Sequence, residues 1–214
     1  MYDYEWDRLK TWLNQYGAID DSIESPDSIT RLDLSAQSLK ELPDFIGILS
    51  NLTALNVSNN NLTSLPDSMK HLSSLKNLDL RRNSFDILPE CIRFLSLGSL
   101  NISGNRLTDI SALQSCKELR VLDVSSNIIA KVSNFLPMNN ELRTLNISSN
   151  LLKEMGSFLP SLTHLERFNI SSNLLVEIPK EIESLNSIVE LDLSSNQIKR
   201  VDSAFLTWML KLLI

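Results

Sequence analysis

The stretch LRTLNISSNLL, residues 142–152, decides the fold because its pattern recurs along most of the chain. We number its residues as places one to eleven: leucine or isoleucine occupies places one, four, six and eleven, and asparagine occupies place nine. The residue at place nine returns every 22 or 23 residues, and internal similarity at such a period is typical of stacked repeats. The residues at place nine are Gln37, Asn60, Asn83, Asn105, Asn127, Asn150, Asn173 and Asn196.

The order of the apolar places predicts the structure of each repeat. Apolar residues at places four and six alternate with polar ones, which is the period of a short β-strand. Parallel strands stack about 4.8 Å apart, and no repeat can bury its apolar face without a neighbour. The amide at place nine can both donate and accept hydrogen bonds. We therefore expect it to bind backbone groups of its own turn and of the adjacent coil.

The pattern resembles the leucine-rich-repeat family over about residues 28–210. The second halves of several repeats, such as LPDFIGIL at 42–49 and LPECIRFL at 88–95, are similar to those of the intracellular Ras-suppressor type and of bacterial members of the family. The resemblance implies an α/β solenoid of eight repeats. Its curved parallel sheet would form the concave face, and helical or 3-10 turns the convex face. The domain division predicted here is a capping helix and linker at 1–27, followed by the solenoid with a C-terminal capping segment at 28–214.

Both ends of a stack need a cap, because the terminal coils otherwise expose their apolar faces. Near the N-terminus, apolar residues at helical spacing predict an amphipathic helix over residues 3–16, which Gly17 ends. We expect this helix to cover the first coil, and a helix that binds a partner is the alternative. The apolar residues are Trp6, Leu9, Trp12, Leu13 and Tyr16.

The C-terminal segment SAFLTWMLKLLI, residues 203–214, is apolar up to its last residue. One interpretation is a final helix that closes the stack with Phe205, Leu206, Met209 and Leu210. The other is a homodimer contact, because exposed apolar patches usually mark association. The segment is too short to span a bilayer, so no membrane span is predicted.

Composition narrows the function classes. The chain has 214 residues, a net charge of −6 and a pI of about 5.0, whereas nucleic-acid binding needs a basic footprint. Residues 1–27 hold seven acids and two bases, so most of the negative charge lies there. The first residues lack an apolar segment and predict no secretory signal, and two cysteines make no disulfide framework. These features predict a cytoplasmic protein, with a secreted bacterial effector as the alternative.

Residues that could carry catalysis do not converge. His71 and His164 fall in the outer segments of distant repeats, and Cys91 and Cys116 lack a nearby histidine or a C-x-x-C spacing. Place five holds aspartate or asparagine in every repeat, which predicts a polar ladder between strands in preference to a metal site. We therefore predict a protein without catalytic residues, metal or cofactor.

Places seven and eight, on the predicted concave face, hold small residues in most repeats. The third repeat instead carries Arg81 and Arg82, with Lys76 at the start of the same strand, and the next repeat carries Arg106 at place ten. Asp79 is the acid beside them. Because arginine presents a planar fork suited to carboxylates, these residues predict contact with an acidic protein partner. A surface pair of Arg81 with Asp79 is the alternative.

Two further rows complete the candidate surface. Place ten is apolar in three adjacent repeats, at Ile128, Leu151 and Leu174, which predicts either an apolar contact stripe or an extension of the core. Arginines at places two and three of successive repeats predict the polar rim of an interface. These arginines are Arg120, Arg143 and Arg167.

Arginine and large apolar side chains carry most of the binding energy in protein interfaces. The sequence therefore predicts a non-catalytic interaction module that binds a protein partner through its concave face. An adaptor, a scaffold and a regulatory subunit all fit this description. The alternative is a self-assembling structural protein that associates through the C-terminal segment.

Overall fold

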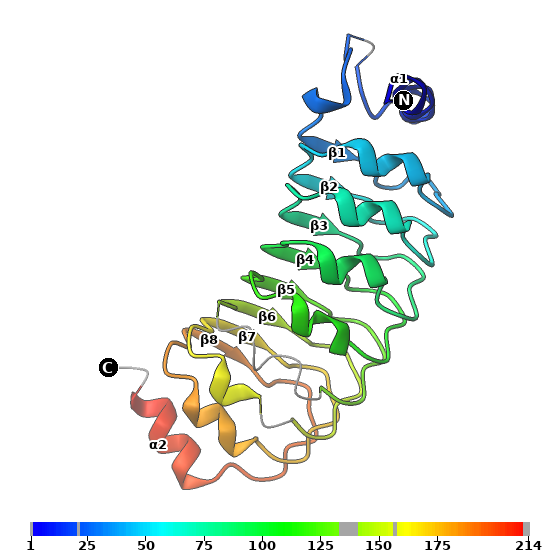
Figure 1. Ribbon diagram of the computed structural model, residues 1–214. Helices are drawn as coiled ribbons and strands as arrows, with labels where there is room; N and C mark the ends of the chain where they lie inside the picture. Colours follow the sequence, from blue (N-terminus) through cyan, green and yellow to red (C-terminus); the bar gives the residue numbers. More distant parts are fainter. Residues whose placement is uncertain (1, 21, 133–140, 156–157, 212–214) are drawn as a thin grey trace.

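The computed structural model of the protein describes residues 2–20, 22–132, 141–155 and 158–211. In these residues, short parallel strands form one eight-stranded sheet whose strands follow chain order (Figure 1). Neighbouring strands pair in register at places three, four and five, so that Leu32 lies beside Leu55. The strands are β1 Arg31–Asp33, β2 Ala54–Asn56, β3 Asn77–Asp79, β4 Ser99–Asn101, β5 Val121–Asp123, β6 Thr144–Asn146, β7 Arg167–Asn169 and β8 Glu190–Asp192.

Short 3-10 helices form the opposite wall of the coils, on the outer side of the bend, while the strands line its inner side (Figure 1). The prolines of the LPxxIxxL-like segments directly precede η2, η3, η4 and η7, where their restricted φ sets the entry into the turn. The 3-10 helices are η1 Pro26–Ser28, η2 Asp44–Ile48, η3 Asp67–His71, η4 Glu90–Phe94, η5 Ser111–Ser115, η6 Leu159–Ser161 and η7 Lys180–Ser184. The predicted solenoid architecture is confirmed.

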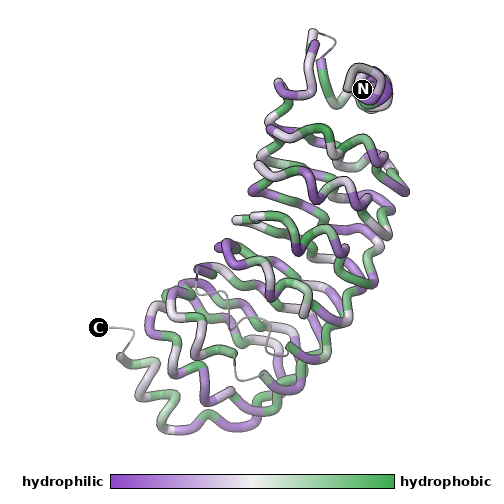
Figure 2. Tube along the Cα trace, viewed as in Figure 1, coloured by the Kyte–Doolittle hydropathy of each residue, from purple (hydrophilic) through white to green (hydrophobic). Residues whose placement is uncertain are grey.

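The core is a continuous column of apolar side chains inside the coils. In β3, for example, Leu78 is buried while Asn77 is exposed. Figure 2 shows the resulting alternation of hydrophobic and hydrophilic residues along the coils. Places one, four, six and eleven are buried from the first repeat to the seventh, as their spacing predicts.

The asparagine at place nine clamps each coil to the one before it. Asn127 Nδ2 donates to the carbonyl of Val124 in its own coil at 3.0 Å and to that of Ile102 in the preceding coil at 3.1 Å. Its Oδ1 accepts the amide of Leu107 in the preceding coil at 2.9 Å. The predicted double role of this amide is therefore confirmed. The same pattern recurs at Asn60, Asn83, Asn105, Asn150, Asn173 and Asn196.

The turn after each strand depends on places five and eight. At place five, the side-chain oxygen accepts the backbone amide of place seven, as Asp123 does from Ser125 at 2.9 Å. At place eight the backbone is left-handed in every repeat, with φ from 52° at Arg82 to 65° at Gly104. This region favours glycine and tolerates asparagine. The backbone thus favours glycine at place eight, although seven of the eight repeats carry another residue there.

The N-terminal helix α1 spans Tyr2–Asn14, close to the predicted 3–16. It packs beside η2 at the end of the stack (Figure 1). Gly17, with φ of 59°, lies just beyond the helix in the left-handed conformation typical of a helix end. The buried residues of α1 are Trp6, Leu9 and Leu13, and its half-buried residues include Trp12.

The C-terminal helix α2 spans Ser203–Lys211 and packs on η7. Its buried residues are Phe205 and Trp208, whose ring centroids lie 5.5 Å apart. The predicted closing role of three further residues was wrong, because they are exposed: Leu206, Met209 and Leu210. Residues 212–214 of the predicted segment lie outside the described residues.

Neither α2 nor any other helix in the described part has the length and apolar character needed to cross a membrane.

The last coil is less covered than the others. Leu191, Leu193 and Ile198 occupy places four, six and eleven, yet they are only half-buried. The contact of α2 is with η7 on the outer side, so the helix leaves the strand side of this coil open.

Candidate functional site

The outward-facing residues of the strands, most of them polar, form the surface that we call the concave face. Asn56 Nδ2 donates to Asp33 Oδ2 on the neighbouring strand, and Asn146 Nδ2 donates to Asp123 Oδ2, both at 3.2 Å. The predicted polar ladder is confirmed at these two pairs. Its carboxylates are engaged in holding turns and strands together.

Arg81 is held by Asp79 on this face. Arg81 Nε lies 3.3 Å from Asp79 Oδ2, and Asp79 Oδ1 accepts the backbone amide of Arg81 at 3.0 Å. Because both side chains are partly exposed, the pair contributes only about 0–1 kcal/mol to stability. The pair that the sequence offered as the alternative is therefore present. The Arg81 side chain is still 48% exposed.

Arg82 differs from its neighbour. Among the described residues its side chain takes part in no ion pair, although it is exposed. It lies against Gly104 of the next coil, where an added Cβ would be 3.2 Å from Arg82 Cγ. Arg106 is also exposed and forms no ion pair in the described part of the chain. We call Arg81, Arg82 and Arg106 the arginine patch.

Lys76 is committed to a link between coils. Its Nζ donates to Glu118 Oε2 at 3.0 Å and to the carbonyl of Ser96 at 2.9 Å. The hydrogen bond and charge of Lys76 lower the pKa of Glu118 below its ordinary value. Lys76 therefore adds little unpaired charge to the arginine patch.

The arginines of the predicted rim are mostly paired along the stack. Arg143 pairs with Glu166, and Arg167 Nε lies 3.5 Å from Glu190 Oε2, in each case one coil further along. Arg120 forms no ion pair among the described residues. Paired charges at a rim set register and specificity more than affinity.

The apolar residues at place ten form a row beside the concave face. Ile128 and Leu151 are 46% and 44% exposed, and Leu174 is half-buried. Leu152, the next residue after Leu151, is fully buried. The row is therefore not a simple extension of the core. We call Ile128, Leu151 and Leu174 the apolar stripe.

The described residues offer no assembled chemical centre. They contain no group of three or more histidine, cysteine, aspartate or glutamate side chains that could hold a metal ion. Cys91 and Cys116 are buried thiols that form no disulfide, and burial raises the pKa of each to about 11. A buried, protonated thiol is a poor nucleophile.

Two features of the surface escaped sequence reasoning. The first is the left-handed backbone at place eight, which the occurrence of Gly104 and Asn59 at that place could have signalled. The second is the link from Lys76 to Glu118, which lie 42 residues apart. No local pattern announces a contact that spans two coils.

The comparisons with known proteins agree with this geometry. A family model described as a leucine-rich repeat region matches residues 30–214. A leucine-rich-repeat protein of Leptospira interrogans is 29% identical, with a TM-score of 0.69 over 87% of this chain and 53% of its own. Internalin C2 of Listeria monocytogenes is 26% identical, with a TM-score of 0.76 over 83% of this chain and 76% of its own. The plant peptide hormone receptor RGFR1, solved in complex with RGF2, is 30% identical, with a TM-score of 0.68 over 79% of this chain and 28% of its own.

No curated protein sequence matches the chain. The chain spans less than two thirds of the Leptospira protein and of the plant receptor. The Ras-suppressor-type subclass stays a prediction. The eight in-register strands of the described sheet, the asparagine clamps and the family model together assign the family: the chain belongs to the leucine-rich-repeat proteins.

Proposed function

We propose that the chain is a non-catalytic interaction module that binds a protein partner through its concave face. The observation that carries the proposal is the state of Arg82. A long, exposed, charged side chain occupies a place where the other repeats carry small residues. Within the described residues it forms no ion pair. A role outside folding accounts for it.

The arginine patch and the apolar stripe supply complementary parts of an interface. The patch lies on the third and fourth repeats, and the stripe begins on the fifth. Arginine binds carboxylates with its planar fork, and burial of an exposed leucine contributes about 1.5–3 kcal/mol. An acidic protein surface with an apolar anchor would satisfy both.

The fold supports this proposal by analogy. The leucine-rich-repeat fold is a common scaffold for protein–protein interaction, and the structure of RGFR1 holds RGF2. Analogy of fold does not identify a partner. The residues of the concave face therefore carry the proposal. An adaptor, scaffold or regulatory role in the cytoplasm fits two buried cysteines that form no disulfide.

Affinity capture from the source cell, quantified by mass spectrometry, tests the proposal. The wild-type chain is compared with the double variant Arg81→Ser and Arg82→Ser. The matched control, Lys70→Ser with Arg93→Ser, removes the same charge from the 3-10 helices η3 and η4. We expect a partner that the control retains and the arginine variant loses. Equal capture by all three proteins would show that the concave patch is not the binding site.

Self-association through α2 is a second candidate function, because Leu206, Met209 and Leu210 are 45%, 40% and 60% exposed. Burial of these side chains against a second copy would remove apolar surface from water. Size-exclusion chromatography with light scattering decides the matter. A monomer at high concentration would eliminate this function without affecting the concave face.

A further inference from the structure

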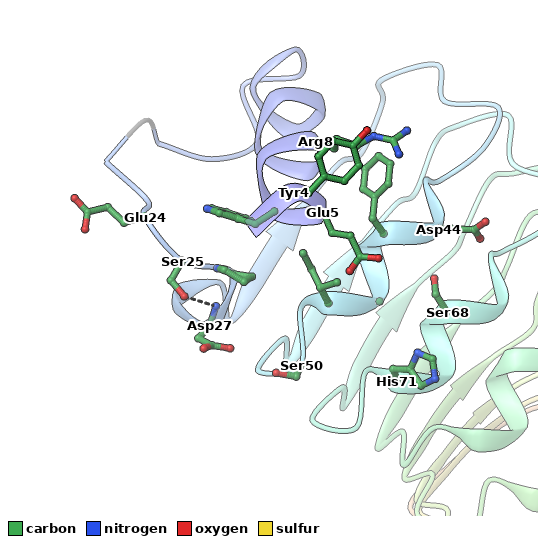
Figure 3. Close-up of a pocket in the computed structure, with 15 residues that line it drawn as sticks. Tyr4, Glu5, Arg8, Glu24, Ser25, Asp27, Asp44, Ser50, Ser68 and His71 are labelled. Atoms are coloured by element: carbon green, nitrogen blue, oxygen red, sulfur yellow. Dashed lines mark hydrogen bonds between the residues drawn. The ribbon is translucent and has the colours of Figure 1, made fainter. Parts of the chain in front are cut away.

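A cavity of about 1320 Å³ opens near the N-terminal end of the solenoid, away from the concave face. Its walls come from α1, from the segment around η1, and from η2 and η3 (Figure 3). Pockets for small molecules are typically about 300–1,000 Å³. The space is therefore large enough for a segment of polypeptide.

Aromatic side chains line this cavity. Tyr4 projects from α1 in Figure 3. The lining also includes Trp6 of α1 and Phe45 of η2. The Arg8 guanidinium carbon lies 4.9 Å from the Phe45 ring centroid and 5.7 Å from that of Tyr4. The cavity thus already holds one cation against its aromatic faces, a contact that is favourable because of the ring quadrupole.

Carboxylates outnumber cations in the lining. Glu5, Glu24, Asp27 and Asp44 line the cavity, and none of them forms an ion pair among the described residues. Arg8 is the basic side chain opposite them, and Figure 3 shows the Glu5 carboxylate directed from α1 toward the outer turns. Residues 1–27 carry a net charge of −5, from seven acids and two bases. The potential in the cavity therefore favours a cationic ligand.

Ser68 provides an independent sign of a missing ligand. Its Oγ is buried and has no hydrogen-bond partner, and it is the sole such side-chain atom in the described part of the chain. Ser68 lines the cavity from η3, beside Gly47 of η2. Buried polar atoms are almost always hydrogen-bonded. Because a Cβ added at Gly47 would lie 2.5 Å from the Ser68 carbonyl oxygen, the two turns are in contact there. A ligand in the cavity would supply the partner after the Ser68 side chain rotates toward it.

We propose that this N-terminal cavity binds an extended segment of a partner protein that carries arginine or lysine side chains. The cationic groups would meet Glu5 and Asp27, and their stems would lie on the aromatic faces. A polar group of the same segment would pair with Ser68 Oγ. The site is separate from the concave face and opposite to it in charge preference, so it does not rest on the proposed function.

The test uses the full chain and a defined probe, the acetylated and amidated peptide Gly-Arg-Gly-Arg-Gly-Arg-Gly. Isothermal titration calorimetry measures its binding, and hydrogen exchange locates it. We expect saturable binding with slower exchange in residues 2–14 and 44–48. A peptide with citrulline at each arginine has the same shape without the charge. We expect it to bind at least about tenfold more weakly.

Matched variants separate the cavity from the overall charge of the protein. Glu5→Gln with Asp27→Asn removes two charges from the cavity and should weaken the probe about tenfold. Glu181→Gln with Glu183→Gln removes two charges from η7 at the far end and should change affinity less than about twofold. Ser68→Ala should weaken binding about threefold while leaving the unliganded fold intact, because it removes an unpaired hydroxyl.

Three results would overturn the proposal. The first is equal binding of the arginine and citrulline peptides, and the second is equal weakening by the two double variants. The third is protection of β3 and β4 in place of α1 and η2. Thermal melting of each variant checks folding. If Glu5→Gln with Asp27→Asn unfolds α1, Ser68→Ala and the location of protection decide the question.

Discussion

Arg82 Cγ lies so close to the backbone of Gly104 that a Cβ at residue 104 would be 3.2 Å away. Both residues occupy place eight of adjacent repeats, and both are left-handed. The absence of a side chain at Gly104 therefore leaves room for the stem of the Arg82 side chain. Because of this contact, the arginine patch can be tested by a substitution at Gly104, without replacing an arginine.

Gly104→Ser should preserve the fold but disturb the patch. Serine is left-handed at place eight in Ser126 and Ser149, with φ of 53° in both, so the loss of stability should be about 1 kcal/mol. The new Cβ would push the Arg82 side chain aside and reduce capture of the concave-face partner. Urea unfolding and quantitative capture measure the two effects. Unchanged capture would mean that the position of Arg82 is irrelevant to binding.

Arg82→Gly should stabilise the protein, since glycine adopts the left-handed region without steric cost. We expect the free energy of unfolding to rise by about 1 kcal/mol, measured by urea denaturation. Arg81→Gly at place seven is the control, which should lose stability because Arg81 pairs with Asp79 and is not left-handed. A destabilised Arg82→Gly protein would show that Arg82 serves the fold and would remove the main support for the proposed function.

Leu151→Ser should separate surface from core. Leu151 is 44% exposed, so its replacement should cost less than about 1 kcal/mol. Leu152→Ala, at the buried place next to it, should cost about 2–5 kcal/mol. Chemical denaturation of the two variants gives the comparison. If both lose stability equally, the apolar stripe belongs to the core and is not a contact surface.

Asn127→Ala should be strongly destabilising although it removes few atoms. The backbone groups that Asn127 pairs, including the Leu107 amide, would be left buried without partners. We expect a loss of about 3 kcal/mol. Asn61→Ala is the control at an exposed place ten, with an expected change within about 0.5 kcal/mol. Similar losses for both would show that the clamp contributes little.

The two cysteines predict a pH effect with a definite sign. The pKa of each thiol is raised to about 11 in the folded chain, against about 8.5 when unfolded. Above about pH 8.5 the unfolded chain loses thiol protons first, so the stabilising contribution falls as pH rises toward 11. Cys91→Ala with Cys116→Ala should flatten the fall seen by urea denaturation between pH 8 and pH 10. A slope unchanged by the substitutions would contradict these pKa values.

The sequence predicts the fold well because the fold is periodic. Each apolar place is sampled in every repeat, so one departure, such as Gln37 at place nine, does not obscure the pattern. The clamps follow from the chemistry of the amide. The face that α2 buries was not predictable, because Phe205 and Leu206 are both apolar and the sequence alone does not say which of them faces the stack.

The candidate sites are less predictable because they depend on contacts between coils. Arg81 and Arg82 are adjacent in the sequence, but their surroundings differ. The left-handed backbone of Arg82 and the missing side chain at position 104 set where the Arg82 side chain lies. The N-terminal cavity draws on residues from Tyr4 to His71, which packing brings together. In the sequence, the only sign of this cavity was the excess of acidic residues in the segment 1–27.

The half-buried last coil gives the solenoid a preferred direction of unravelling. Leu191 and Leu193 hold β8 with less burial than any earlier strand, while α1 seals the first coil. Under a stretching force applied at both ends, we expect β8 to detach first and the loss to travel toward β1. Each event would free one coil of 22 or 23 residues, about 80 Å of extended chain. The length of the molecule would then increase in steps of nearly equal size, one step for each coil that unfolds.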